Sequence, residues 1–330
     1  MDLGEQTLHL SSKKSKLSIL LILLLLLGIV LLGSSESFSH SRVSQNLDYY
    51  TVRKGQSFNS IIEEFSLHPY HKLLLKIYIN ANKLDIAQAG HYYIKDYSWK
   101  DFLNSISIGD VTIFKLKIPA GKNLYEIEKI LSESNLINDC YGFKCLDDSF
   151  KFIEGTLKPD TYFYSYLSSS SKILRQSQSE FFQLASSLWA NKSPQLPLKN
   201  LSDAIILASI VEKEAGNELE KPVIAGVFLH RLILGMKLQA DPTIIYGLLP
   251  NFNGDITKKN IQDKKNPYNT YQIKALPPTP ISTISQSSLE AVILGMKNDY
   301  LYFVAKGDGT HYFSKTYNEH LEAVKKYQLN

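Results

Sequence analysis

Two glutamates at the end of an apolar helical run are the residues best able to do acid–base chemistry. Glu212 and Glu214 lie in the run 207–216, in which most other residues are aliphatic or small. A carboxyl group that is buried without a charged partner disfavours its ionised form, so its pKa rises and it can donate a proton near neutral pH. The candidate chemistry is therefore proton transfer by one of these glutamates.

The run 201–216 is typical of a buried helix that points the two glutamates in different directions. Asn200 and Asp203 offer capping or first-turn groups and Gly216 a stop, while apolar residues recur at helical spacing between them. Residues two apart on a helix point about 200° away from each other, so one glutamate is the candidate acid and the other needs a structural partner. Spacing alone leaves the choice open, and two ordinary helix-end glutamates are the alternative.

Short sequence runs downstream of this helix occur in a characteristic order. They read GVFLHRL at 226–232, GMKLQADPTIIYG at 235–247, PYNTY at 267–271 and LPPTPI at 276–281. Together with the glutamate helix, these runs resemble the MltG (YceG-like) family of membrane-anchored endolytic murein transglycosylases. The resemblance extends from EG at 154–155 and PDTY at 159–162 to YFVA at 302–305 and HYF at 311–313. Several ordered runs are far more specific than any single motif.

The resemblance implies both a reaction and a catalytic residue. It implies cleavage of the MurNAc–GlcNAc bond of peptidoglycan without water, leaving a 1,6-anhydro-MurNAc end, with Glu214 as the single acid and base. The attacking 6-hydroxyl belongs to the substrate, so no second carboxylate is needed as nucleophile or water activator. Ala275 stands where the family often has glycine, and 217–221 match weakly. Both departures concern substrate contacts rather than the reaction.

Polar and aromatic residues within these runs are the candidates to bind the glycan. The rings of Tyr246, Tyr268 and Tyr271 can stack on sugar faces, and polar groups can bond to sugar oxygens. Each candidate has a structural alternative, such as a core position for a tyrosine, an Asx turn for Asp241 or a cap for Asn269. The substrate-binding residues that we predict are Glu212, Gln239, Asp241, Thr243, Tyr246, Asn269, Thr270, Tyr271 and His311.

The sequence does not indicate a metal, a cofactor or a nucleic-acid partner. His230, His311 and His320 lack the spacing of zinc ligands, and there is no HExxH motif, phosphate-binding glycine loop or nucleophile elbow. The formal net charge of +4 is small and scattered, which does not favour nucleic acid. We therefore predict an enzyme that works without a cofactor or metal.

Residues 17–33 form an uncharged apolar run that predicts one transmembrane helix. At 1.5 Å per residue this run spans about 25 Å, close to the ~30 Å hydrocarbon core of a bilayer. Lys13, Lys14 and Lys16 precede it and Glu36 is the first charge after it, which predicts a cytoplasmic tail at 1–16 and a periplasmic remainder. The serine-rich residues 34–46 predict a polar linker. A cleaved signal peptide is the alternative to a retained anchor.

The part beyond the linker predicts an α+β fold in two pieces. Residues 50–58 read as strand, glycine turn and helix. They also resemble the opening of a LysM module, a small fold known for binding glycans, and this resemblance implies a LysM-like module at 47–110. Residues 111–330 predict the catalytic domain, with helices at 174–191, 201–216 and 318–327 and a hairpin at 300–314. Glycan binding by the module stays open. So does the choice between a disulfide and free thiols for Cys140 and Cys145.

The expected protein is a single-pass enzyme of the inner (cytoplasmic) membrane that cuts peptidoglycan glycan strands. The resemblance implies a role in ending the growth of nascent strands, near the peptidoglycan synthases. The alternative comes from another class of function: a non-catalytic, membrane-anchored protein that binds peptidoglycan, in which Glu214 only caps or bridges. The sequence does not reveal partner proteins, preferences for glycan length or stem peptide, or oligomeric state.

Overall fold

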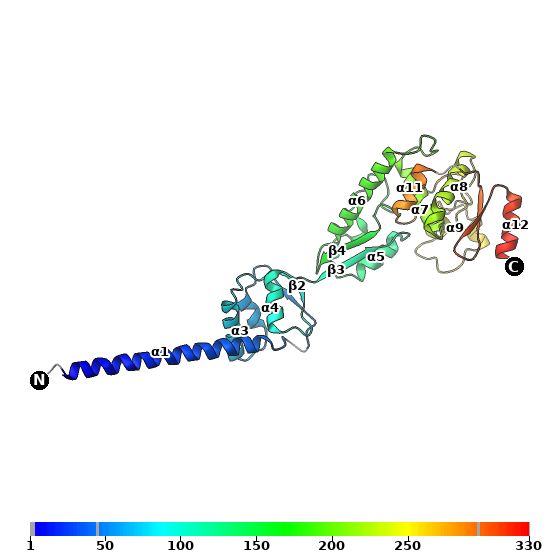
Figure 1. Ribbon diagram of the computed structural model, residues 1–330. Helices are drawn as coiled ribbons and strands as arrows, with labels where there is room; N and C mark the ends of the chain where they lie inside the picture. The colour runs from blue at the N-terminus through cyan, green and yellow to red at the C-terminus, as the bar shows by residue number, and fades with distance from the viewer. Residues whose placement is uncertain (1–3, 44–45, 296–297, 330) are drawn as a thin grey trace. The chain divides into compact units, whose positions relative to one another are not determined.

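A computed structural model describes residues 4–43, 46–295 and 298–329 of the 330-residue chain (Figure 1). The described strands form three two-stranded sheets, β1–β2, β3–β4 and β5–β6, which lie among many helices. The chain divides into two compact units, Met1–Phe114 and Lys115–Asn330. This mixture of helix and sheet confirms the predicted α+β class.

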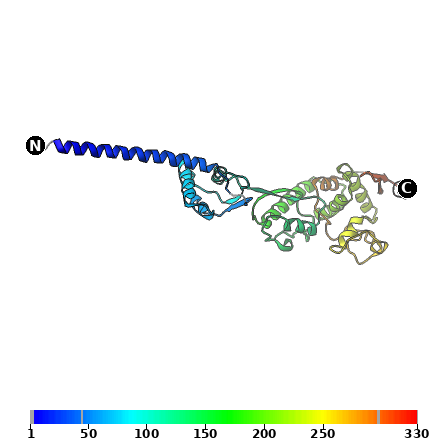
Figure 2. The same cartoon turned by 90° about the horizontal axis from the view of Figure 1, so that it is seen from below.

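Helix α1 (Gly4–Ser39) is continuous and contains the predicted apolar run (Figures 1 and 2). Its segment Lys16–Ser39 reaches a mean hydropathy of 3.0. Within the described residues, it is the one segment long and apolar enough to cross a membrane. A signal sequence has the same length and composition, so the segment fits an anchor or a signal sequence equally.

The predicted linker at 34–46 is wrong for residues 34–39, which continue α1 and pack against α3 (Pro69–Ala81). Ser35 Oγ donates a hydrogen bond to Leu74 O at 2.9 Å, and the ring of Phe38 stacks on that of His71 with centroids 4.3 Å apart. Ser35 and Ser39 are buried. Serine-rich composition suggests a tether, but here the small side chains allow two helices to approach closely. Residues 44–45 of the linker lie outside the described part.

The other elements of the first unit form a small mixed module. Strand β1 (Tyr49–Val52) pairs antiparallel with β2 (Gly90–Tyr93), and Tyr49 lies opposite Tyr93. Helices α2 (Phe58–Glu64) and α3 lie between these strands in sequence, and α4 (Trp99–Ile108) follows them. Trp99, Phe102 and Tyr92 are fully buried in the core of this unit, where their large apolar areas stabilise the fold.

The second unit begins within β3 (Ile113–Ile118), which pairs with β4 (Asp160–Ser165). Helix α5 (Leu124–Ser132), the short η1 (Tyr141–Phe143) and the long α6 (Ser170–Ala190) complete this part. A capping box starts α5: Asn123 Oδ1 accepts from Glu126 N, and Glu126 Oε2 accepts from Asn123 N, both at 3.0 Å. These bonds satisfy backbone donors that a helix start otherwise leaves free.

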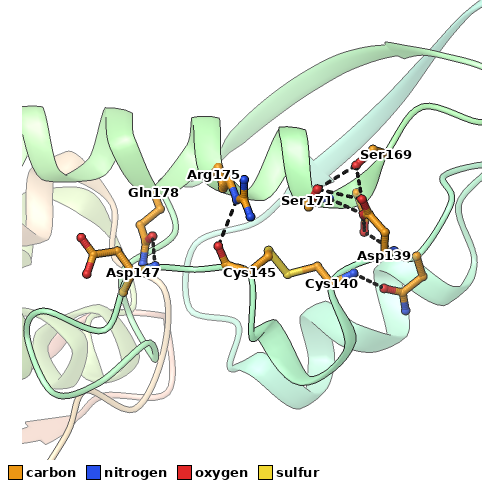
Figure 3. The surroundings of a disulfide bond; sticks show 10 residues. Asp139, Cys140, Cys145, Asp147, Ser169, Ser171, Arg175 and Gln178 are labelled. Atoms are coloured by element: carbon orange, nitrogen blue, oxygen red, sulfur yellow. Dashed lines mark hydrogen bonds between the residues drawn. A yellow bond between two sulfur atoms is a disulfide. The ribbon is translucent and has the colours of Figure 1, made fainter.

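Cys140 and Cys145 form a disulfide whose Cα atoms are 5.3 Å apart (Figure 3). This finding decides the question that the sequence left open. Arg175 Nε of α6 donates to Cys145 O at 3.0 Å, and Asp139 Oδ1 accepts from Ser171 N at 2.8 Å. The disulfide loop is therefore fastened to α6 on both sides of the bond.

Helix α7 (Leu201–Glu214) is the central helix of the second unit and packs against α8 (Lys221–Ile233) and α11 (Gln286–Leu294) (Figure 1). Asn200 Oδ1 accepts from Asp203 N at its start, and every residue from 204 to 211 is buried. The helix is therefore surrounded by protein, as its two apolar stripes predict. Its C-terminal turn carries both glutamates.

Six further elements complete the second unit in the described part of the chain. They are η2 (Glu218–Glu220), α9 (Asp241–Gly247), α10 (Lys258–Gln262), β5 (Tyr302–Ala305), β6 (His311–Ser314) and α12 (Tyr317–Gln328). β5 and β6 pair antiparallel, with Phe303 opposite Phe313, and α12 packs against both strands. The predicted hairpin and terminal helix are confirmed.

Candidate active site

The structure separates the two glutamates by the direction of their side chains and by their partners. Glu212 is 10% exposed in its side chain, and its Oε2 lies 3.4 Å from Lys221 Nζ. The same oxygen accepts from Ser285 N at 3.0 Å and from Ser288 Oγ at 2.6 Å. Glu212 therefore joins α7 to α8 and α11. Its predicted substrate contact is corrected to a structural role, because its carboxylate is occupied by protein donors.

Glu214 lines an open cavity of about 530 Å³, here called the glutamate cavity. This volume lies in the range of small-ligand sites. The predicted residues that the structure brings together in this cavity are Glu214, Gln239, Asp241, Tyr271 and His311. Residues that sequence reasoning did not select also line it, and the main ones are Arg231, Tyr302, Tyr317 and His320.

The carboxyl group of Glu214 is held in a protonated form by its surroundings. Burial, and then the negative charge of Asp241, raise the pKa of Glu214 to about 8, while the positive charge of Arg231 acts in the opposite direction. Within the described residues, no hydrogen bond reaches this carboxyl group. A half-buried acid that keeps its proton at neutral pH and faces a cavity is the arrangement that general acid catalysis requires.

Arg231 supplies a buried positive charge beside the glutamate cavity. Its Nε donates to Leu301 O at 2.7 Å and its Nη1 to Leu238 O at 2.6 Å. Its guanidinium group lies 5.4 Å from the centre of the Tyr302 ring, a cation–π distance. Burial lowers the pKa of Arg231. In the sequence, Arg231 stands within the GVFLHRL run at 226–232. This run alone predicts an ordinary helix, so it did not mark Arg231 as a site residue.

Gln239 and Asp241 lie on the strap, here residues 235–241, which connects α8 to α9 and ends at the first residue of α9. Gln239 has a φ of 51°, a left-handed conformation that costs a residue with a side chain some free energy and is frequent at functional sites. Tyr271 Oη donates to Asp241 Oδ1 at 2.8 Å. Burial raises the pKa of Tyr271, and the bond to Asp241 adds to this effect. Gln239, Asp241 and Tyr271 thus present an amide, a carboxylate and a phenol to the glutamate cavity.

Thr243 and Thr270 hold this strap from inside the protein. Both are fully buried, and Thr270 Oγ1 accepts from Ala240 N at 2.9 Å while Thr243 Oγ1 donates to Ala240 O at 2.6 Å. A fully buried hydroxyl cannot touch a sugar. The predicted substrate contacts of these two threonines are therefore corrected to a positioning role beneath Gln239 and Asp241.

Asn269 and Tyr246 also lie away from the glutamate cavity. Asn269 is fully buried, and its Nδ2 donates to Asp263 O at 2.8 Å, which fixes the end of α10. Tyr246 Oη donates to Glu154 Oε2 at 2.9 Å and the residue lines a different cavity. Both residues were predicted to bind substrate because of their places in the sequence runs. In the structure, Asn269 anchors a loop and Tyr246 lines a different cavity, so both predictions are corrected.

His311 is placed in the glutamate cavity by a carboxylate that the sequence did not single out. Its Nδ1 lies 2.7 Å from Glu220 Oε2, and its backbone N donates to Glu220 Oε1 at 2.8 Å. A carboxylate at Nδ1 fixes the orientation of an imidazole ring. His320 of α12 also lines the cavity and is stacked on Tyr302 with centroids 5.2 Å apart. Glu220 falls in 217–221, which match the family pattern weakly.

The part of the chain that the structure describes contains no group of three or more His, Cys, Asp or Glu residues arranged to hold a metal ion. The groups that line the glutamate cavity are the acid Glu214 with its raised pKa, the carboxylate of Asp241, the guanidinium group of Arg231, and several aromatic and amide groups. Such a set can move a proton and bind hydroxyl-rich ligands.

Comparison with known proteins identifies the class to which this fold and site belong. The model of the YceG-like family matches residues 50–326. A solved YceG-like protein from Listeria monocytogenes superposes with a TM-score of 0.55 and 26% identity, covering 83% of this chain and 97% of that one. The chain therefore belongs to the YceG-like family.

Curated relatives carry the name endolytic murein transglycosylase. The Bacillus subtilis (strain 168) protein is 34% identical over 180 residues, which cover 53% of this chain and 48% of the relative. A Streptococcus pneumoniae (strain D39) protein is 26% identical over 297 residues, which cover 76% of this chain and 52% of the relative. The chain spans about half the length of the curated relatives it matches.

Proposed function

We propose that this chain is an endolytic peptidoglycan lytic transglycosylase. In this proposal it cleaves the MurNAc–GlcNAc bond of glycan strands and leaves 1,6-anhydro-MurNAc ends. Membership of the YceG-like family and the names of the curated relatives support the activity class. The chemistry of the glutamate cavity supports the reaction in detail.

The reaction needs one acid that later becomes a base. The Glu214 carboxyl group donates its proton to the glycosidic oxygen as the bond from that oxygen to the anomeric carbon breaks. The 6-hydroxyl oxygen of the same MurNAc then bonds to the anomeric carbon, and its proton passes to the Glu214 carboxylate. The acid is restored and no water is consumed, so a second catalytic carboxylate as nucleophile or water activator is unnecessary.

The difference between Glu214 and Glu212 is the observation that carries this proposal. Glu212 is bound by Lys221, Ser285 and Ser288, whereas Glu214 faces the glutamate cavity with a pKa of about 8. A proton donor must be uncommitted and protonated at the working pH. Of the two glutamates, only Glu214 combines both properties.

The charged neighbours of Glu214 have complementary roles in the proposed reaction. Asp241 keeps Glu214 protonated before the reaction, and its negative charge stabilises the positive charge that develops on the sugar ring. Arg231 stabilises the Glu214 carboxylate that exists between the two proton transfers. Gln239, Tyr271 and His311 are placed to bond with sugar hydroxyl and acetamido groups.

We further propose that α1 anchors the protein in the inner membrane, with the tail 1–16 in the cytoplasm and the rest in the periplasm. The apolar segment of α1 supports an anchor. The Cys140–Cys145 disulfide supports an oxidising compartment. The strand–helix–helix–strand order from β1 to β2 supports a LysM-like module at 47–110, beside a catalytic domain at 111–330. Cutting nascent strands near their synthases then ends their growth.

Mass spectrometry of the products tests the proposed function. The full-length chain in detergent micelles is incubated with purified glycan strands, and the released fragments are weighed. We expect fragments that each lack one water relative to hydrolysis products. Fragments with ordinary reducing ends would identify a hydrolase. Intact strands would favour the alternative, a non-catalytic peptidoglycan-binding protein.

A further inference from the structure

A second cavity, here called the tyrosine cavity, is bordered by two of the elements that border the glutamate cavity and also has a volume of about 530 Å³. The last turn of α7 borders both, because Lys213 lines the tyrosine cavity and Glu214 the glutamate cavity. The start of α9 also borders both, through Pro242 and Asp241 respectively. The same turn of α7 and the same end of α9 therefore contribute to both cavities.

The lining of the tyrosine cavity has the chemistry of a saccharide site. Tyr125 is 53% exposed and Tyr246 is half-buried, so aromatic faces are available for the C–H faces of sugar rings. The aliphatic and proline side chains that complete the apolar surface are Pro242, Ile245, Leu249, Pro250 and Ile281. Asn123 and Glu126 add polar groups at the wall formed by α5.

Lys213 gives this cavity a positive charge that suits an anionic polymer. Within the described residues, its ammonium group makes one side-chain hydrogen bond, to Gly121 O at 3.2 Å, and an ammonium group has three donors. Glu126 is already paired with Lys122 Nζ at 2.5 Å. A ligand carboxylate, such as the lactyl group of a MurNAc that carries no stem peptide, can therefore bind Lys213 without displacing an internal ion pair.

A buried carboxyl group holds two walls of the tyrosine cavity together. Glu154 is 4% exposed, and its Oε2 accepts both from Leu124 N of α5 at 3.1 Å and from Tyr246 Oη of α9 at 2.9 Å. Its Oε1 accepts from Gly155 N at 3.2 Å. The side chain of Glu154 therefore joins α5 directly to α9.

We propose that the tyrosine cavity is a saccharide subsite that binds the continuation of the glycan strand beyond the sugar at Glu214. This inference rests on the proposed function for the identity of the strand. Tyr125 is the residue that contacts the sugar ring, Lys213 binds its carboxylate, and Glu154 is a positioning residue. In this proposal, one glycan strand occupies both cavities.

Photo-crosslinking tests the subsite without requiring catalysis. Full-length Glu214→Gln protein in detergent micelles, with Tyr125 replaced by benzoylphenylalanine, is irradiated with an eight-sugar glycan that carries no stem peptides. We expect a crosslink at position 125 that an excess of unlabelled glycan suppresses. The matched control carries the same probe in place of Tyr141, which is 71% exposed on η1 and should not crosslink. Equal crosslinking at both positions, or none at 125, overturns the subsite.

Kinetics of the unlabelled enzyme give a second, independent readout. We expect Tyr125→Ala to raise the KM for the eight-sugar glycan about tenfold, with kcat nearly unchanged, and Tyr141→Ala to change neither. An unchanged KM in Tyr125→Ala overturns the subsite while the proposed function stands. A crosslink at 125 in a chain that cleaves no glycan supports the subsite and overturns the proposed catalysis, so the two failures are distinguishable.

Discussion

The carboxylate of Glu212 lies 3.4 Å from the ammonium group of Lys221, and the Lys221 side chain is only 3% exposed. Lys221 Nζ also donates to Ser285 Oγ at 2.9 Å. A charge buried to this degree is tolerated because it is paired and hydrogen-bonded. This ion pair distinguishes Glu212 from Glu214, for which we propose a different function.

Removing the charge of Glu212 should weaken the fold rather than the chemistry. We expect Glu212→Gln to lower the free energy of unfolding by about 1–3 kcal/mol, because Lys221 loses part of its compensation. Urea denaturation of the full-length chain measures this change. Glu322→Gln, an exchange of an exposed glutamate on α12, is the control and should have little effect. Equal stability of both variants would contradict the structural role.

The pH dependence of cleavage should report the proton on Glu214. A donor with a pKa of about 8 is protonated below that pH, so kcat/KM should fall about tenfold per pH unit above pH 8. Asp241 raises this pKa, and Asp241→Asn should therefore move the alkaline decline to lower pH. A pH–rate profile from pH 6 to 10 measures both effects. If the alkaline decline of Asp241→Asn lies at the same pH as that of wild type, the charge of Asp241 does not raise the pKa of Glu214.

The same pKa makes a prediction about stability. The folded pKa of Glu214, about 8, exceeds its ordinary value of 4.5, so the folded state holds an extra proton between these pH values. The stability that this carboxyl group contributes is fully present below pH 4.5 and is lost as pH rises through 8. Glu214→Gln cannot ionise. Its advantage over wild type should therefore grow between pH 5 and pH 8, by about 1–3 kcal/mol.

Denaturation of both proteins at pH 5 and pH 8 measures this difference. Glu154 also has a raised pKa, of about 7, but it is present in both proteins and its contribution cancels. A constant stability difference at the two pH values would show that Glu214 titrates normally.

The disulfide should contribute to stability and not to catalysis. By the chain-entropy model, a loop as short as Cys140–Cys145 stabilises the folded state by about 2 kcal/mol. Neither cysteine lines the glutamate cavity. A double Cys140→Ser, Cys145→Ser variant should therefore unfold at lower urea and keep wild-type kcat/KM. Reductant should lower the stability of wild type and leave that of the variant unchanged, whereas a loss of cleavage in the variant would link this loop to the site.

Much of the fold was predictable because its signals are local. The apolar stripes of 201–214, the hairpin around 307–309 and the apolar run at 17–33 each follow from spacing within one segment. Residues 34–39 were not predictable, because burial of Ser35 depends on Leu74, a residue distant in sequence. Composition carries no information about such a partner.

The site was predictable only in part, for a similar reason. Gln239 and Asp241 reach the glutamate cavity, whereas Thr243 and Thr270, equally polar and in the same runs, support them from beneath. Which polar residue faces the cavity depends on the path of the strap. Arg231 was missed because only the tertiary fold shows that an arginine in an apolar helix is buried beside an acid.

A paired cleavage assay tests the central claim most directly. Glu214→Gln and Glu212→Gln are compared with wild type at equal concentrations of folded protein, and the release of anhydro-ended fragments is quantified. We predict that Glu214→Gln loses release by about 10³-fold or more, since its amide cannot donate the proton, while Glu212→Gln stays within a few-fold of wild type. Release that survives in Glu214→Gln and disappears in Glu212→Gln would contradict the assignment of the catalytic acid.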